Sequence, residues 1–170
     1  MRSRTEKTAI LALFSALALA TGAIESLFPI PFPGVRLGLT NVFHFLALLI
    51  YGSAEAVMVA SVRLFLAFLL TGNPFAFACS AGGLLCSLPL SIFLYKKYGD
   101  DLSVPAISVA SAAAFNAGQV SVVVILTSEP SILAYLPVIM AIGSVTGYLV
   151  GYIAGNLRCR IESCRLRRSP

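Results

Sequence analysis

Long apolar stretches, separated by short polar or proline- and glycine-containing breaks, make up almost the whole sequence. A helix that crosses a membrane needs about 20 predominantly apolar residues, and six segments approach that length. The expected spans cover roughly residues 8–28, 39–51, 54–70, 75–95, 104–126 and 132–156. The second is short for a full crossing, so its limits are the least defined. The pattern predicts an all-α membrane protein folded as a six-helix bundle.

The breaks between these spans contain residues that end helices. Pro29, Pro31 and Pro33 follow the first span, and proline removes an amide donor and disfavours helix in the residue before it. Gly52-Ser53 divides the second span from the third. The proline-rich segment is too stiff for a slack tether. We therefore expect it to form a defined loop, which serves either as a lid over a site or as a simple connector.

Composition and charge agree with a membrane protein. Of the 170 residues, 58% are hydrophobic and only 11% are charged, whereas about a quarter of a soluble domain is charged. This balance excludes an ordinary soluble domain and a disordered chain. We expect one transmembrane domain over residues 1–157 and a basic cytoplasmic tail over residues 158–170.

The positive charges lie on one side of the predicted bundle, which indicates its orientation. The residues on that side are Arg2, Arg4, Lys7, Lys96, Lys97, Arg158, Arg160, Arg165, Arg167 and Arg168, and only Arg36 falls on the opposite side. By the positive-inside rule, both termini are expected in the cytoplasm and the chain in the plasma (inner) membrane. The net charge of +5 is thus explained by the orientation of the chain in the membrane and by contact of its basic residues with membrane lipids. Nucleic-acid binding is not expected.

Polar side chains within the spans gather between the middle and the outer edge of the membrane. Ionisable groups in a span are costly and usually face a partner, a cavity or a substrate. The seven residues in this layer, from five helices, are Glu25, Asn41, His44, Arg63, Ser80, Asn116 and Gln119. Together with Arg36 of the outer loop, they form the predicted ligand-binding set. The layer favours a pocket that opens outward.

Each of these residues also has a structural interpretation. Glu25 and Arg63 are candidates for an ion pair, and His44 for a packing residue. Asn116 and Gln119, which lie one turn apart, are able to join neighbouring helices by hydrogen bonds. The Ser80 hydroxyl is able to donate a hydrogen bond to a carbonyl of its own helix. A polar packing network therefore remains the alternative to a pocket.

Two stripes of small residues predict close helix contacts. Ala12, Ala16 and Ala20 form one face of the first span, and small residues at this spacing let helices approach closely. A longer stripe follows the sixth span at Gly143, Gly147, Gly151 and Gly155, and we expect it to pack within the bundle. The cysteines show no CxxC pair and no cluster with histidine, so neither a metal site nor another cofactor is predicted.

Several segments, in order along the chain, resemble one family. Residues 33–41, PGVRLGLTN, resemble the PGxKLGLAN signature of the Gx transporter family, also catalogued as heptaprenyl diphosphate synthase component I. Further matches are Gly52, Arg63, Gly72, residues 80–85 (SAGGLL), residues 116–119 (NAGQ) and residues 135–137 (YLP). The chain departs from the pattern at Arg36, Thr40 and Phe115, where Lys, Ala and His are usual.

The resemblance implies a function as well as a fold. The family is similar to the substrate-binding S components of energy-coupling factor (ECF) transporters, which have six helices, cytoplasmic termini and an outer pocket. Such proteins dock on a transmembrane scaffold subunit through an AxxxA face of the first helix, matched here by Ala12, Ala16 and Ala20. In those transporters, two ATPase subunits drive the transport cycle. A phosphate-binding GxxxxGK[ST] loop is absent from this chain, so ATP would be hydrolysed by those partners.

Three function classes follow. The leading one is an S component that binds a small vitamin-like or anionic molecule, with a flavin-like compound, another vitamin or a prenyl diphosphate left open. The second is a non-catalytic membrane subunit of a heptaprenyl diphosphate synthase. Catalysis by this chain is not expected, because Asp100-Asp101 lacks the third aspartate of a DDxxD motif at Val104 and a magnesium diphosphate needs several oxygen ligands. The third is a purely structural membrane protein.

Overall fold

The computed structural model describes residues 4–26, 40–99 and 101–166, with side chains described as far as Arg160. These residues form six α-helices and one 3-10 helix, and no strand occurs among them. The helices are α1 (Arg4–Ser26), α2 (Asn41–Ile50), α3 (Ser53–Thr71), α4 (Pro74–Tyr98), α5 (Val104–Thr127), η1 (Pro130–Tyr135) and α6 (Leu136–Leu166). The predicted all-α membrane bundle is therefore confirmed.

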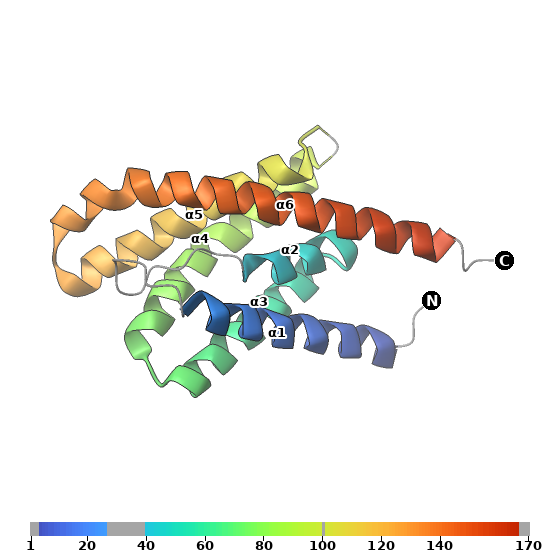
Figure 1. Cartoon of the computed structure of the whole chain (residues 1–170), viewed down its shortest axis with the longest axis horizontal. Coiled ribbons are helices and arrows are strands. Elements are labelled where there is room, and N and C mark those ends of the chain that lie inside the picture. Colours follow the sequence, from blue (N-terminus) through green and yellow to red (C-terminus); the bar gives the residue numbers. More distant parts are fainter. Residues whose placement is uncertain (1–3, 27–39, 100, 167–170) are drawn as a thin grey trace.

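The helices run back and forth between two ends of the molecule. The start of α1 and the end of α6 lie at the same end, together with the α2–α3 and α4–α5 turns (Figure 1). The α3–α4 turn and the connection from α5 to α6 lie toward the opposite end (Figure 1). We call these the terminal end and the distal end. The predicted cytoplasmic side corresponds to the terminal end.

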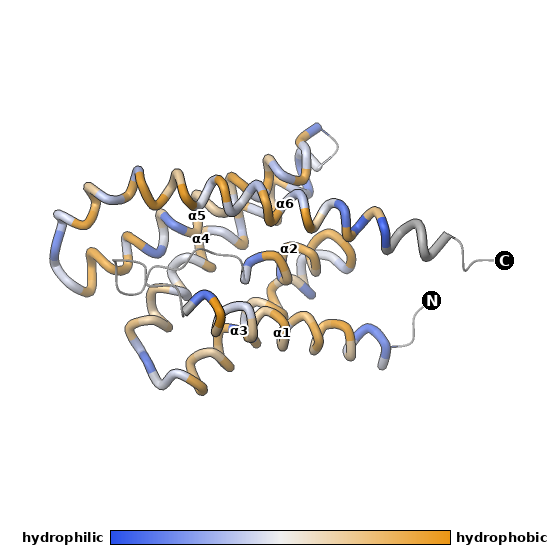
Figure 2. The backbone as a smooth tube through the Cα atoms, viewed as in Figure 1, coloured by the Kyte–Doolittle hydropathy of each residue, from blue (hydrophilic) through white to orange (hydrophobic). Residues whose placement is uncertain are grey.

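Hydropathy follows this arrangement. Hydrophilic residues concentrate at helix ends and turns, whereas the middle parts of the helices are mostly hydrophobic (Figure 2). Among the described helices, α1, α3, α4, α5 and the η1–α6 segment are long and apolar enough to cross a membrane. The ten-residue α2 is about 15 Å long at 1.5 Å per residue, which is half of a hydrocarbon core of about 30 Å.

Local sequence explains several helix limits. The Asn73 side chain accepts a hydrogen bond of 3.1 Å from the Ala76 amide at the start of α4, and the Ser103 hydroxyl accepts one of 3.4 Å from the Ala106 amide at the start of α5. Such caps satisfy amides that have no partner inside the helix. Gly72 ends α3 with a φ of 60°, a left-handed conformation that glycine adopts without strain.

The sixth helix differs from its predicted limits at both ends. It begins at Leu136, four residues later than expected, and 3-10 helix η1 occupies the preceding residues. Pro137 explains this start, because proline lacks an amide donor and is tolerated only in the first turn of an α-helix. The helix ends at Leu166 instead of residue 156, since the arginine- and leucine-rich sequence that follows has high helix propensity.

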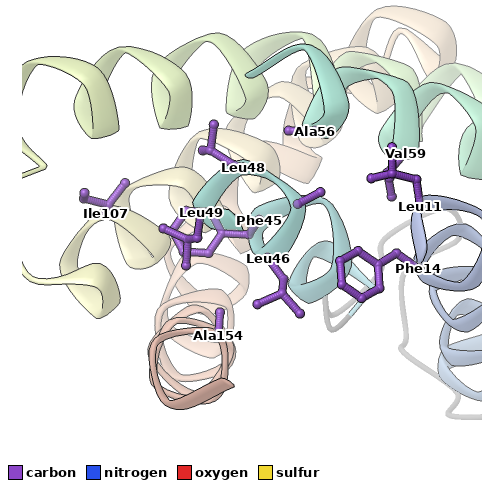
Figure 3. Close-up of a cluster of buried hydrophobic side chains, with 11 residues drawn as sticks. Leu11, Phe14, Phe45, Leu46, Leu48, Leu49, Ala56, Val59, Ile107 and Ala154 are labelled. Carbon is purple, nitrogen blue, oxygen red and sulfur yellow. The ribbon is translucent and has the colours of Figure 1, made fainter. Parts of the chain in front are cut away.

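The short helix α2 is the centre of the largest apolar core. Its residues Phe45, Leu46, Leu48 and Leu49 point away from it in several directions (Figure 3). They belong to one cluster with Leu11 and Phe14 of α1, Ala56 and Val59 of α3, Ile107 of α5 and Ala154 of α6. Neighbouring helices surround α2 on most sides and shield it from lipid. Such a helix need not be long enough to cross the membrane by itself. This burial accounts for a span that is short in sequence.

The contacts divide the molecule into two halves. In the N-terminal half, α1, α2 and α3 all contact one another; in the C-terminal half, α5 packs extensively on both α4 and α6. The main contacts between the halves are α2 on α6 and α3 on α4. We call this interface the seam.

Glycines hold the helices of the C-terminal half at close range. A Cβ atom added at Gly118 of α5 would lie 2.6 Å from the carbonyl oxygen of Gly82 on α4. One added at Gly151 of α6 would lie 2.5 Å from the Cα atom of Pro105 on α5. The predicted packing role of the glycine stripe on α6 is thus confirmed, with α5 as the neighbour.

Candidate ligand site

The polar residues predicted to line a pocket are mostly buried. The described members with little exposed surface are Glu25, His44, Arg63, Ser80, Asn116 and Gln119. Asn41 is partly buried. Arg36 and the proline-rich loop that carries it lie outside the described residues. Thus the described members of the predicted set turn inward, away from the surface that faces lipid in a membrane protein.

Arg63 joins two elements of the N-terminal half. It lies on α3, is only 3% exposed, and its Nη1 atom donates a hydrogen bond of 3.3 Å to Oδ1 of Asn41 on α2. A guanidinium carries five donors, so it is able to bind several groups at once. Burying such a charge is costly unless it is paired and hydrogen-bonded.

Arg63 also lines a pocket between α3 and α4. Ser80 of α4 lies in the same lining, as do Phe68 of α3 and Phe77 of α4. The two rings are tilted by 52° with their centroids 5.0 Å apart. This α3–α4 pocket therefore combines a cation and a hydroxyl with aromatic walls.

A second pocket lies where α2 faces α5 and α6. Its polar lining consists of Asn41, His44, Ser108, Ser111 and Thr146. His44 is 2% exposed, and its Nδ1 atom has no hydrogen-bond partner among the described residues. An unsatisfied buried polar atom is unusual and costs free energy. We call this cavity the α2–α6 pocket.

Both pockets are small as they stand. Each has about 10 Å³ accessible to the centre of a water molecule, which is roughly the room that one water needs. A vitamin-sized molecule requires a pocket of about 300 Å³ or more. Binding of such a molecule within the described residues would therefore require the helices to separate.

Asn116 makes a contact between helices of the C-terminal half. Its Nδ2 atom donates a hydrogen bond of 3.1 Å to the carbonyl oxygen of Ile139 on α6. This is the helix-joining arrangement considered from the sequence. Gln119, one turn further along α5, is fully buried, and Glu25 is buried near the end of α1. Their predicted roles in ligand binding stay predictions.

The pockets also contain residues that sequence reasoning missed. Ser108, Ser111 and Thr146 were not singled out, nor were Phe68 and Phe77. Serine and threonine are common in membrane helices, where their hydroxyls bond to their own backbone, so their type gave little signal. One signal was available in the sequence. Ser108 and Ser111 are spaced so that they share a face of α5 with Phe115 and Gln119.

The predicted docking face is on the surface of the molecule. Ala12, Ala16 and Ala20 of α1 are all exposed, whereas Leu11, Phe14 and Ala18 of the same helix are buried. The small residues therefore take no part in packing the described bundle. Among the described residues, no group of three His, Cys, Asp or Glu side chains is placed to hold a metal ion.

Apolar helices around a buried polar layer define a helical, multi-pass type of membrane protein. The family model described as heptaprenyl diphosphate synthase component I matches residues 14–157. The chain belongs to this family. No curated protein and no solved structure gives a significant match.

Proposed function

We propose that the chain is the membrane-embedded substrate-binding component of an ECF-type transporter. The observation that carries this proposal is the burial of Arg63, His44 and Ser80 around small pockets inside a membrane bundle. A polar interior of this kind is typical of substrate or ion pathways. In this proposal Glu25, Asn41, Asn116, Gln119 and Arg36 complete the ligand-binding set, and the substrate is a small vitamin-like or anionic molecule.

The topology in the proposal follows from the charges. The terminal end carries Lys7, Lys96 and Lys97, so it faces the cytoplasm of the plasma (inner) membrane by the positive-inside rule. The polar residues then lie toward the outer, distal end, where a substrate arrives. The exposed alanines of α1 supply a face for a transmembrane scaffold subunit, on which ATPase subunits act. These partners come from the resemblance alone.

The binding part of the proposal is tested by detecting a bound small molecule. The protein is purified in mild detergent and analysed by native mass spectrometry, and a retained small molecule is expected. Arg63→Ala should lose it, whereas Ala141→Leu, at an exposed position on α6, should keep it. Retention of the same molecule by a folded Arg63→Ala variant would contradict the proposed site.

The docking part is tested separately. Replacing Ala12 and Ala16 by Leu adds bulk to the exposed face of α1 and should abolish co-purification of a scaffold subunit, because small residues permit the close approach. Ala141→Leu adds a leucine at an exposed position of another helix and serves as the control. If the scaffold still co-purifies with the double variant, the docking face has been assigned to the wrong surface.

A second candidate function rests on the family description. The description names component I of heptaprenyl diphosphate synthase, so the chain is also a candidate for a non-catalytic membrane subunit of such an enzyme. A prenyl-transfer assay on a catalytic subunit, with and without this chain, separates the two. A rate that rises several-fold on addition of the chain supports the accessory role, and an unchanged rate favours the transporter.

A further inference from the structure

The seam between the two halves contains both pockets. The α3–α4 pocket has walls from α3 of the N-terminal half and α4 of the C-terminal half. The α2–α6 pocket has walls from α2 on one side and from α5 and α6 on the other. Arg63 lines the first, Asn41 lines the second, and a hydrogen bond joins them. The two pockets are therefore neighbouring parts of one interface.

The seam changes character along its length. Toward the terminal end it is apolar, because Phe45 and Leu49 of α2 share a cluster with Ile107, near the start of α5, and Ala154, late in α6. Most of the polar lining, including Asn41 on α2, Ser111 on α5 and Thr146 on α6, comes from positions further toward the distal end. Phe45 and Ser108 line the pocket where it meets the apolar cluster. Opening the polar part exposes groups that water hydrates, whereas opening the apolar part exposes hydrophobic surface, so separation costs less at the distal end than at the terminal end.

The polar linings differ in charge. The α3–α4 pocket has a cation, Arg63, beside Ser80 and two aromatic rings. The α2–α6 pocket has an amide, an imidazole and three hydroxyls. A guanidinium binds carboxylate or phosphate groups through two parallel hydrogen bonds. The Ser111 and Thr146 hydroxyls already donate to backbone carbonyl oxygens. Nδ1 of His44, in contrast, has no hydrogen-bond partner among the described residues. A neutral hydrogen-bonding group of a ligand would satisfy this nitrogen, whereas an apolar tail would leave it unsatisfied, which is costly.

We propose that the two pockets are the ends of one ligand site at the seam, which opens when the N-terminal half moves away from the C-terminal half. The site takes a polar anion with several hydrogen-bonding groups. Its anionic group binds Arg63, and its neutral part lies among His44, Ser108 and Thr146. This inference rests on the proposed function and deepens it, because it selects a polar anion over a prenyl diphosphate.

The experiment measures water access and charge selectivity at the seam, without a known ligand. In a background with the four cysteines replaced, Ala76→Cys samples the α3–α4 pocket and Ala112→Cys the α2–α6 pocket. Ala141→Cys, exposed on α6, is the matched lipid-facing control. Each variant, reconstituted in liposomes, is treated with a sulfonate-bearing methanethiosulfonate reagent and with its trimethylammonium counterpart.

Both seam positions should react at least tenfold faster than position 141, because opening admits water to the seam. When each rate is divided by the reagent's rate with a free thiol in solution, position 76 should favour the sulfonate reagent over the cationic one about tenfold, given a neighbouring unit charge in a medium of intermediate dielectric. Arg63→Gln should remove this preference, and Arg63→Lys, which keeps the charge, should restore most of it.

Three results would overturn the inference. One is a rate at positions 76 and 112 no higher than at position 141. Another is a charge preference at position 76 that Arg63→Gln leaves unchanged. The third is protection of Ala112→Cys by farnesyl diphosphate, which would place a prenyl chain in the polar pocket. The cysteines at positions 76 and 112 could react as expected while no small molecule and no scaffold subunit co-purify. That result would contradict the proposed function and still support a seam that opens to water.

Discussion

The two halves of the molecule are packed by different means. In the N-terminal half, large side chains such as Phe14, Phe45 and Val59 fill the space between α1, α2 and α3. In the C-terminal half, glycines such as Gly82 and Gly118 bring helix backbones into direct contact. Both arrangements bury surface, but they restrict movement to different degrees.

This difference bears on the proposed opening of the seam. Backbone contacts through glycine fix two helices in register, because a shift of less than an ångström produces a clash or a gap. A core of large side chains is also close-packed, but individual side chains in it do change rotamer. If the seam opens as proposed, we therefore expect the C-terminal half to stay together as a rigid support and the N-terminal half, with the short helix α2 at its centre, to adjust.

The largest expected effect is in the core of the N-terminal half. Phe45→Ala should lower the free energy of unfolding by about 3 kcal/mol, because it leaves a cavity at the centre of the apolar cluster. Phe65→Ala is the matched control, since Phe65 is 57% exposed whereas Phe45 is 2% exposed. Titration with sodium dodecyl sulfate in mixed micelles measures both. Equal losses would show that α2 is not the packing centre.

A smaller loss is expected for overpacking in the C-terminal half. Gly118→Ala places a Cβ atom 2.6 Å from the Gly82 oxygen and 2.8 Å from the Cys86 sulfur, so α4 and α5 must separate at a cost of about 1–3 kcal/mol. Gly155→Ala is the control, because its Cβ atom would meet Val104 at an ordinary 3.7 Å. Titration with sodium dodecyl sulfate measures the free energy of unfolding of both variants. A neutral Gly118→Ala variant would mean that the helix pair is not rigid.

The two halves also differ in how far the sequence predicted them. The glycine stripe of α6 was sufficient to predict close packing, because glycine at every fourth position of a membrane helix is typical of a helix contact. The burial of α2 was not predictable, since a short apolar segment does not reveal which neighbours surround it. Charged and amide residues indicated the polar layer, because they are costly in a membrane. The serines and threonine of the α2–α6 pocket were missed, since they also satisfy their own helix backbone.

Asn116 gives the smallest expected effect and separates two interpretations of the polar layer. Asn116→Ala removes the hydrogen bond to the Ile139 carbonyl and should cost about 0.6 kcal/mol, an average value for such bonds between membrane helices. Asn156→Ala, at an exposed position of α6, should cost less. The same variants are then compared for small-molecule retention by native mass spectrometry.

The combination of the two measurements decides the role of Asn116. If the variant is destabilised by the expected amount and retains the small molecule, Asn116 joins α5 to α6 and belongs to the rigid support. If it keeps its stability and loses the molecule, Asn116 contacts the ligand, and the site extends from the seam into the C-terminal half. The second outcome would keep Asn116 in the ligand-binding set of the proposed function. It would contradict the division into a rigid half and a moving half, because ligand binding would then require α5 and α6 to separate as well.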